Sequence, residues 1–345
     1  MKKLEKIKVG ISVGDINGIG IEIILKTFED SRMLDFCTPV IFCASKVVSY
    51  HSKALNLEIP FNGVNAIDKI VPNKINIVNC WNDTVNIEFG KETAGGGKYA
   101  LLSLEAASNA LKNNAVDVLV TAPINKHNIQ SDSFIFKGHT EYLEAQFEGE
   151  SLMILMTDSL RIGLITGHIP VQQISEKITA ELIVRKVDIM YKSLVKDFGI
   201  SKPKIAVLGL NPHCGDNGVI GDEDEKIVRP VLNKLQEDGK LVYGPYAADS
   251  FFGSASYEKF DGVLAMYHDQ GLGPFKTLAF GNGVNFTAGL NVVRTSPDHG
   301  TAYEIAGKNS ASHSSFKEAL FAAIKIFESR KNYIELTKKS LQIKK

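Results

Sequence analysis

The sequence KIKVGISVGDINGIGIEIILKTFE, residues 6–29, decides the fold. Lys6–Val13 is a short apolar run of strand length, and Gly20–Glu29 carries apolar residues at helical spacing. The glycines between them, in Gly14–Gly20, permit a tight turn and a close approach of backbone or ligand. The stretch therefore predicts a strand, a turn and a helix, the first unit of an α/β fold around a mainly parallel sheet.

The same alternation of short apolar runs and longer amphipathic stretches continues along most of the chain. The further predicted strands are Pro39–Ala44, Ile75–Cys80, Asp117–Pro123, Leu152–Thr157, Leu160–Thr166, Lys204–Leu210 and Asp261–His268. The further predicted helices are Lys98–Asn113, Thr179–Asp197, Glu223–Asp238 and Ser315–Arg330, the last continuing toward a solvated tail that ends at Lys345.

One pair of strands breaks the alternation. Leu152–Thr157 and Leu160–Thr166 are separated only by Asp158 and Ser159, a connection that suits a tight hairpin between antiparallel strands. The predicted sheet is therefore mixed. No flexible linker or internal repeat marks a domain boundary, so topology places it near residue 130.

The composition excludes several classes of function. The 345 residues include 39 Lys and Arg against 39 Asp and Glu, so the chain has no overall basic charge for nucleic acid or an anionic membrane. Four scattered cysteines without a C-x-x-C pair fit a reducing cytoplasm rather than a disulfide framework or a structural zinc site. The first apolar run is too short to be a signal peptide or a membrane span.

Three histidines close apolar runs that are predicted strands: His168 in LITGH, His213 in LGLNPH and His268 in LAMYH. Ligands of open α/β sheets bind outside the carboxyl ends of the strands, where such side chains can converge. Three imidazoles suit Zn²⁺ or Co²⁺ better than Mg²⁺ and leave positions open for a substrate. The alternative is that each histidine makes an ordinary loop hydrogen bond.

The glycine-rich segments give weaker signals. Gly14–Gly20 lies between a strand and a helix and is either a plain turn or a ligand-binding loop, but it is not G-x-G-x-x-G. TAGGGK, Thr93–Lys98, lacks the spacing of a phosphate-binding loop and is predicted to be a flexible loop. No G-x-S-x-G pattern supports a serine hydrolase.

Two other segments carry candidate ligand-binding residues. Lys276, Asn285 and Arg294 stand among glycines in KTLAFGNGVNFTAGLNVVR and could anchor a phosphate and a carboxylate. His139 and Thr140 open a predicted helix, where Thr140 could cap the helix and His139 could face a ligand.

Taken together, these segments resemble the 4-hydroxythreonine-4-phosphate dehydrogenase family. The resemblance runs from about Val9 to about Lys325 and rests on seven landmarks in the family's order. They are ISVGDINGIGIE, GHTEYLEAQ, LITGHIP, LGLNPHCGDNGVIG, VLAMYHDQG, FKTLAFGNGVN and RTSPDHGTAYEIAGK. The resemblance implies a two-domain, three-layer αβα fold with a mixed sheet, similar to the isocitrate and isopropylmalate dehydrogenases.

The resemblance also implies roles for the candidate residues. It places a divalent metal (Zn²⁺, Co²⁺ or Mg²⁺) on His168, His213 and His268. It assigns substrate binding to His139, Thr140, Lys276, Asn285 and Arg294. It assigns NAD or NADP binding to the segment that contains Asp298, His299, Gly300 and Gly307.

The family further implies a homodimer whose metal site draws on both subunits. It implies a discontinuous first domain on the cofactor side, residues 1–130 with 280–345. Residues 131–279 then form the second domain, which carries the metal and substrate site and makes the dimer contact.

The implied reaction is a metal-dependent oxidation of 4-phosphooxy-L-threonine by NAD(P)⁺. Its product, 2-amino-3-oxo-4-phosphooxybutanoate, decarboxylates to 3-amino-2-oxopropyl phosphate in pyridoxal 5'-phosphate biosynthesis. Asp249 and Lys276 are the candidate general bases, with a metal-bound hydroxide as a third. The alternatives are a dehydrogenase of erythronate or threonate 4-phosphate, a non-catalytic binding protein and a metal-dependent hydrolase.

Overall fold

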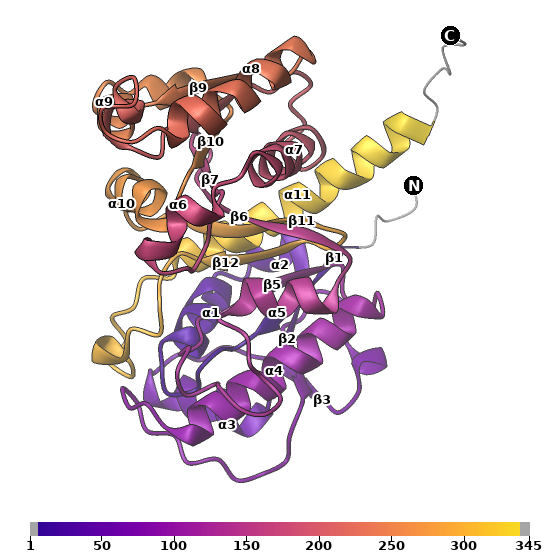
Figure 1. The fold of residues 1–345 in the computed structure, drawn as a ribbon. Coiled ribbons are helices and arrows are strands. Elements are labelled where there is room, and N and C mark those ends of the chain that lie inside the picture. Colours follow the sequence, from indigo (N-terminus) through magenta and orange to yellow (C-terminus); the bar gives the residue numbers. More distant parts are fainter. Residues whose placement is uncertain (1–5, 339–345) are drawn as a thin grey trace. The chain divides into compact units, whose positions relative to one another are not determined.

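The protein has an α/β fold of two compact units, each with its own group of neighbouring strands. The computed structural model describes residues 6–338. The first unit is Met1–Glu148 with Asn291–Phe327, and the second is Gly149–Leu290 with Glu328–Lys345. Figure 1 labels the elements of both units.

The first unit contains six parallel strands in the order β3-β4-β2-β1-β5-β12. All seven residues of β2 are buried, as are the last four of β1, which is expected of parallel strands covered on both faces. The strands are β1 (Ile7–Ser12), β2 (Cys37–Cys43), β3 (Asn62–Val64), β4 (Asn76–Asn79), β5 (Val118–Thr121) and β12 (Arg294–Pro297).

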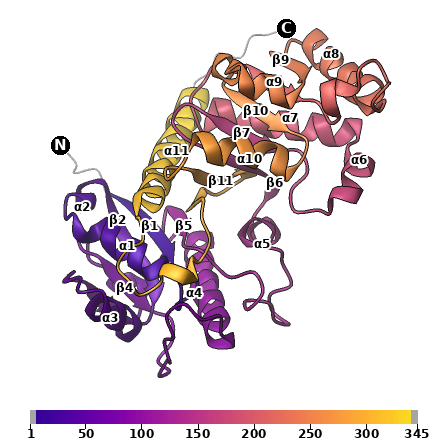
Figure 2. The ribbon, with the colours of Figure 1, turned by 90° about the vertical axis from the view of Figure 1, so that its left-hand side faces the viewer.

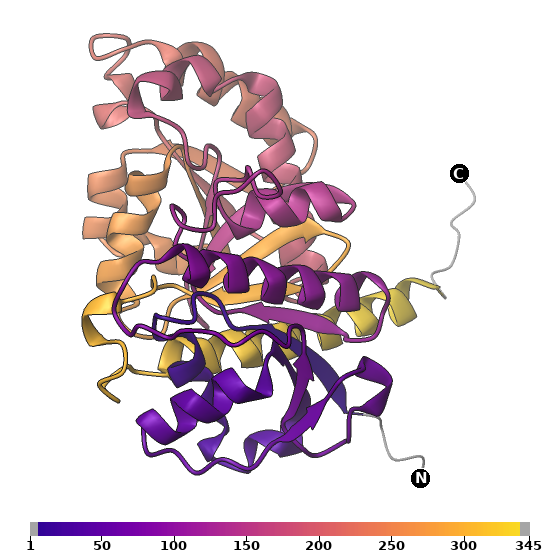
Figure 3. The ribbon, with the colours of Figure 1, turned by 90° about the horizontal axis from the view of Figure 1, so that it is seen from below.

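Helices cover both faces of these strands (Figure 3). The helix α4 (Ala94–Lys112) packs against β1, β2 and β5. On the other side α1 (Gly20–Glu29) packs beside α2 (Met33–Phe36). The helix α2 lies against α11 (Ser314–Lys338), where the rings of Phe36 and Phe321 are 5.2 Å apart. The remaining helices of this unit are α3 (Ser45–Ala54), α5 (His139–Gln146) and the short 3-10 turns η1 (Ile67–Lys69) and η6 (Tyr303–Ile305).

The second unit contains six strands in the order β11-β6-β7-β10-β8-β9. Figure 2 labels β6, β7, β9, β10 and β11. The strand β6 runs antiparallel to both of its neighbours, β11 and β7, and the other pairs are parallel. The predicted hairpin is confirmed, since the Thr157 amide donates to the Leu160 carbonyl at 2.9 Å. The strands are β6 (Gly149–Met156), β7 (Arg161–Leu164), β8 (Ile205–Leu208), β9 (Val242–Tyr246), β10 (Gly262–Ala265) and β11 (Val284–Leu290).

The strand β10 of the second unit shows helices on both of its faces. Phe275 of α10 (His268–Leu278) is fully buried in a cluster with Val263 and Ala265. The alternate residue Gly262 faces Met190 of α7 (Ala180–Lys196), so α7 and α10 cover opposite faces. The other helical segments are η2 (Val171–Gln173), α6 (Ile174–Lys177), η3 (Pro212–Gly215), η4 (Asp224–Val228), α8 (Arg229–Glu237), α9 (Ala248–Gly253) and η5 (Ser256–Lys259).

All eight strands that the sequence predicts are present, and so are all six predicted helices, including the one that begins at His139. The predicted α/β class and mixed sheet are therefore confirmed. The prediction missed β3, β9, β11 and β12, which are short or contain glycine and proline. The last helix continues to Lys338, and the predicted tail beyond it lies outside the described residues. Within residues 6–338, none of the helices combines the length and the apolar character needed to cross a bilayer.

The prediction of a flexible loop at Thr93–Lys98 is wrong. Thr93 is the N-cap of α4, and its Oγ1 accepts a hydrogen bond from the Gly96 amide at 3.0 Å. Gly97 lies so close to a neighbouring loop that a Cβ atom there would be 1.9 Å from the Asn128 carbonyl oxygen. These glycines therefore form the first turn of a helix that packs tightly against the chain following β5.

Two alanine substitutions in this turn should have different effects on stability. Gly97→Ala should lower the free energy of unfolding by roughly 1–3 kcal/mol, since the new methyl group overlaps the Asn128 carbonyl. Gly95→Ala is the matched control because the nearest atom to its Cβ would be 3.8 Å away. It should leave stability unchanged or raise it by up to about 1 kcal/mol. Urea unfolding of both variants tests the close packing, and equal stabilities would contradict it.

Candidate functional site

A buried carboxylate links three loops of the first unit. Asp15 follows β1 and is completely buried. It accepts hydrogen bonds from the Asn17 amide at 2.8 Å, from Asn128 Nδ2 at 2.7 Å and from Tyr303 Oη at 2.8 Å. Asn128 follows β5 and Tyr303 follows β12, so the carboxylate joins the chain at the carboxyl ends of three neighbouring strands. We call these three loops the strand-end loops.

The start of α4 belongs to the same network. Asn17 Nδ2 donates to Thr93 Oγ1 at 2.9 Å, and Asn128 Nδ2 donates to the Thr93 carbonyl at 3.0 Å. A Cβ at Gly96 would be 2.7 Å from both oxygens of Asp15, so the first turn of α4 packs directly against that carboxylate. The positive end of the helix dipole favours a negative charge at this position.

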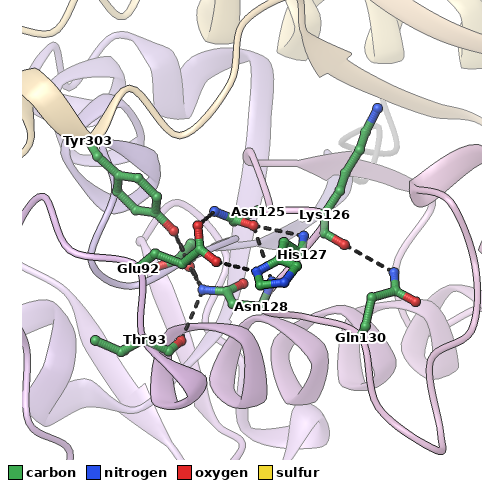
Figure 4. Close-up of polar contacts among 9 residues, drawn as sticks. Glu92, Thr93, Asn125, Lys126, His127, Asn128, Gln130 and Tyr303 are labelled. Carbon is green, nitrogen blue, oxygen red and sulfur yellow. Dashed lines mark hydrogen bonds and ion pairs between the residues drawn. The ribbon is translucent and has the colours of Figure 1, made fainter.

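Glu92, Asn125 and His127 form a second, more exposed cluster of polar side chains, drawn in Figure 4. Glu92 accepts a hydrogen bond from Asn125 Nδ2 at 2.7 Å, and its Oε1 is 2.5 Å from His127 Nδ1. The hydrogen bond with His127, followed by that from Asn125, lowers the pKa of Glu92. Burial and the hydrogen bond to Asp15 raise the pKa of Tyr303, so that its hydroxyl stays protonated as a donor.

The glycine loop after β1 is packed against the candidate cofactor segment. The Ile19 amide donates to the Thr301 carbonyl at 3.0 Å, and a Cβ at Gly18 would be 2.8 Å from that oxygen. The loop therefore does more than reverse the chain, because it holds the segment that the resemblance assigns to NAD(P).

The four candidate cofactor residues lie along this segment in different surroundings. The Asp298 amide donates to Ser315 Oγ at 3.1 Å, and His299 Nδ1 is 3.1 Å from the Gly300 carbonyl oxygen. A Cβ at Gly300 would have no neighbour within 4 Å. Gly307 has a left-handed backbone, with φ of 76°, and packs against Phe89. Its backbone conformation and its packing on Phe89 therefore explain the glycine at 307, whereas Gly300 faces open space.

Arg294, the first residue of β12, has a buried guanidinium. Arg294 is 2% exposed and donates from Nε and Nη2 to Thr121 Oγ1 at 3.1 and 2.5 Å. Burial lowers its pKa to about 9, while the Glu141 carboxylate acts in the opposite direction. A desolvated guanidinium with a fixed fork of donors is suited to bind a carboxylate or phosphate.

His139 begins α5 and lies in the electrostatic field of Arg294. Burial, together with the charges of Arg294 and Lys126, lowers the pKa of His139 well below 6.5, which keeps the ring neutral. Its Nε2 is buried and has no hydrogen-bond partner among the described residues. Thr140 follows it and is half-buried, and Gly138 rather than Thr140 is the N-cap of α5. The first unit thus brings His139 and Arg294 together. The buried Nε2 of His139 is a polar atom that a ligand could contact.

The other two substrate candidates lie in the second unit. Asn285 is on β11, and its Nδ2 donates to Met153 Sδ at 3.4 Å. Its Oδ1 is buried and has no hydrogen-bond partner within the described chain. Lys276 is exposed on the last turn of α10.

The three histidines follow β7, β8 and β10, as the sequence predicts. The rings of His168 and His268 are neighbours, with centroids 5.3 Å apart. His268 Nδ1 is 2.7 Å from Asp269 Oδ1, an arrangement that orients an imidazole for metal binding through its other nitrogen. His213 lies in η3 with φ of 53° and is exposed. Within residues 6–338 of one chain, no three His, Cys, Asp or Glu side chains are grouped as metal ligands.

The first candidate base, Asp249, is exposed at the start of α9. Its charge contributes weakly to raising the pKa of Cys214, after burial and the charge of Asp224 among others. Asp249 therefore lies on the side of the second unit that carries His213, the residue before Cys214.

Sequence reasoning missed Asp15, Asn128 and Tyr303. Asp15 and Asn128 follow predicted strands, so the rule that singled out the three histidines would have found both had it been applied to every polar side chain. Tyr303 follows β12, a strand that was not predicted, and no local pattern marks it.

Comparisons with known proteins place the chain in a family. Residues 35–323 match the family described as "Pyridoxal phosphate biosynthetic protein PdxA". A "4-hydroxythreonine-4-phosphate dehydrogenase" of Bacteroides thetaiotaomicron is 53% identical over 94% of this chain and 90% of its own length. A "Putative D-threonate 4-phosphate dehydrogenase" of Oceanobacillus iheyensis is 33% identical over 92% of this chain and 97% of its own length.

A solved structure extends the likeness to the fold. The crystal structure of a "4-hydroxythreonine-4-phosphate Dehydrogenase" from Klebsiella pneumoniae has a TM-score of 0.80. It is 30% identical and the match covers 95% of this chain and 99% of that one. The family match, the identity over nearly the whole chain and the common fold agree: the chain belongs to the pyridoxal phosphate biosynthetic PdxA family.

Proposed function

We propose that this protein oxidises 4-phosphooxy-L-threonine with NAD or NADP in the biosynthesis of pyridoxal 5'-phosphate. The observation that carries the proposal is the 53% identity, over 94% of the chain, to a relative named for this activity. The buried Arg294 beside the neutral His139 supports it, because a desolvated guanidinium with a fixed fork of donors is suited to bind an anionic group of a small substrate.

In this proposal the substrate-binding residues are His139, Thr140 and Arg294 of the first unit and Lys276 and Asn285 of the second. The phosphate and the carboxylate are the two anionic groups, and Arg294 and Lys276 are the matching cations. The buried, unpartnered Nε2 of His139 and Oδ1 of Asn285 are consistent with ligand contacts, since buried polar atoms in proteins are nearly always hydrogen-bonded.

The reaction removes two hydrogens from the C3 carbinol of the substrate. A base would take the hydroxyl proton, and NAD(P)⁺, when bound, would supply the acceptor for the hydride that leaves C3. The resulting β-keto acid, 2-amino-3-oxo-4-phosphooxybutanoate, then loses its carboxyl group as CO₂ and gives 3-amino-2-oxopropyl phosphate. Asp249 and Lys276 remain the candidate residues for the base, and both are exposed on the second unit.

The residues fit a divalent metal in part. His168 and His268 are adjacent nitrogen donors, and the third ligand of the proposal is His213. We propose that it is contributed across a homodimer, as the resemblance implies, because the three side chains are not grouped within the described part of one chain. When bound, Zn²⁺, Co²⁺ or Mg²⁺ would lower the pKa of the substrate hydroxyl and stabilise the negative charge that develops on its oxygen.

The cofactor is proposed to bind along Asp298–Gly307, which the strand-end loops hold in place. The hydrogen bond from Tyr303 to Asp15 fixes this segment relative to β1 and β5. Gly300 leaves open space at its exposed end. On this proposal the first unit is the cofactor side, the second carries the metal, and the protein is cytoplasmic. The expected domain boundaries near residues 130 and 280 lie before the boundaries of the two compact units, which fall after Glu148 and Leu290.

A sugar-acid phosphate is the second candidate substrate. The relative from Oceanobacillus iheyensis, named for D-threonate 4-phosphate, favours it. The two substrates differ at C2, where one carries an amine and the other a hydroxyl, so comparative rates distinguish them.

The direct test mixes metal-stripped protein with 4-phosphooxy-L-threonine and NAD⁺ or NADP⁺ and follows the absorbance of the reduced cofactor. We expect no reduction until Zn²⁺, Co²⁺ or Mg²⁺ is added, and then turnover at roughly 1–10³ s⁻¹. D-threonate 4-phosphate in place of the substrate is the parallel arm. Faster turnover of that compound would move the assignment to the sugar-acid phosphate, and no reduction with either compound in a folded protein would reject a dehydrogenase.

Replacing the buried arginine should separate activity from stability. Arg294→Met should reduce kcat/KM for the phosphorylated substrate by about 100-fold or more, because an anionic group loses its guanidinium partner. Its thermal midpoint should be no lower than that of the parent, since an apolar side chain of similar volume removes a buried charge. Arg229→Lys, in the partly exposed ion pair with Glu225, is the control and should change neither value. Unchanged kcat/KM in Arg294→Met would contradict the proposed role.

Removing the hydroxyl of Tyr303 tests whether the first unit binds the NAD(P) cofactor. Tyr303→Phe deletes the donor to Asp15, a hydrogen bond to a charged group worth roughly 1.5–3 kcal/mol. We expect the KM for NAD(P)⁺ to rise about tenfold, while the KM for the phosphorylated substrate stays within about twofold. Tyr333→Phe, on the exposed end of α11, is the matched control. Equal effects on the two KM values would show that Tyr303 acts on general stability alone.

A further inference from the structure

A polar cavity lies on the α7 side of the second unit. Its volume is about 400 Å³, within the roughly 300–1,000 Å³ range of pockets for small organic ligands. The lining comes from one face of α7, from the adjoining ends of β6 and β11, and from α11. Every lining residue belongs to the second unit, and none is a residue proposed above for substrate, metal or cofactor.

The cavity lies on the opposite side of the sheet from α10, the helix that begins with His268. Met190 of α7 faces Gly262, whereas Phe275 of α10 packs on Val263, the next residue of β10. Successive residues of a strand point to opposite faces. The cavity is therefore separate from the proposed metal site.

A buried ion pair forms one wall of the cavity. Arg330 is 7% exposed and Asp197 is 4% exposed. Arg330 Nε donates to Asp197 Oδ1 at 2.6 Å, and its Nη1 donates to the Leu290 carbonyl at 3.1 Å. Ser193 Oγ donates to the other oxygen of Asp197 at 2.7 Å. Because all these groups are fixed by hydrogen bonds, this wall is preorganised.

The carboxylates of the lining already have cationic partners. Glu150 is paired with Arg185 at 3.2 Å and with Lys186 at 3.0 Å. Asp188 is paired with Lys240. With Asp197 paired to Arg330, each of the three acidic side chains is neutralised, and further lysines in the lining carry excess positive charge.

Two lysines supply that excess. Lys192 and Lys196 are one helical turn apart on the cavity face of α7, and neither ammonium group has a hydrogen bond or ion pair within the described residues. Like charges at this spacing repel each other. Burial, followed by the charge of Arg330, lowers the pKa of Lys196. A bound anion would relieve both repulsions.

We infer that this cavity binds a small phosphorylated metabolite, with its phosphate between Lys192 and Lys196. A phosphate dianion matches the two unpaired cations in charge and offers several acceptor oxygens to their ammonium groups. The cavity is larger than a phosphate ion alone requires, and Ile189 and Leu290 provide an apolar surface for the organic part of the ligand. The inference is independent of the proposed dehydrogenase activity.

Lysine acylation of the full-length protein, read residue by residue by mass spectrometry, tests this site. The probes are inorganic phosphate and glycerol 3-phosphate, with neutral glycerol as the control compound. Either phosphate should slow acylation of Lys196 by about threefold or more, with the ester acting at lower concentration, while the exposed Lys202 should be unaffected. Lys276 reports separately on phosphate at the proposed active site.

Replacing Lys192 then tests whether Lys196 is protected from acylation by phosphate bound in this cavity. Lys192→Met should raise the glycerol 3-phosphate concentration for half-protection of Lys196 by about tenfold, and Lys202→Met should not change it. Dehydrogenase turnover should stay within about twofold of the parent in both variants. Equal protection by glycerol, no protection of Lys196 by either phosphate, or protection unchanged in Lys192→Met would each overturn the inference.

Discussion

The hydrogen bonds to the buried Asp15 carboxylate organise the first unit. Its charge has no cationic partner among the described residues, and a buried carboxylate is stable only when hydrogen bonds and dipoles replace its hydration. Three donors and the first turn of α4 meet that requirement. They come from segments that follow β1, β5 and β12, so satisfying one charge fixes the loops at the edge where ligands of α/β sheets bind.

A second set of buried polar side chains in the same unit includes an atom whose hydrogen bonding is incomplete. Arg294 is desolvated with a hydroxyl partner in Thr121, and the neutral His139 beside it has an unpartnered Nε2. A buried polar atom without a partner lowers stability unless a ligand completes it. The first unit therefore combines a satisfied network that holds its loops with a buried guanidinium and a neutral imidazole, and these two are the groups of the first unit proposed to bind the substrate.

Much of the fold could be predicted from the sequence because local periodicity specifies it. Gly20–Glu29 is the predicted helix to the residue, and the Asp158-Ser159 hairpin is as expected. The features that were predicted wrongly or missed depend on contacts between residues that are far apart in the sequence. The glycines after Thr93 form a helix because of a cap and of packing on Asn128. Asp15 meets donors 113 and 288 positions away, a distance that no local pattern spans.

The identity of the product tests the central claim most directly. Mass spectrometry and ³¹P NMR of a reaction with metal, NAD(P)⁺ and 4-phosphooxy-L-threonine would follow both the carbon skeleton and the phosphate. The account predicts loss of the carboxyl carbon as CO₂, retention of the phosphate ester and one reduced cofactor for each 3-amino-2-oxopropyl phosphate formed. Release of inorganic phosphate without cofactor reduction would contradict it and indicate a hydrolase.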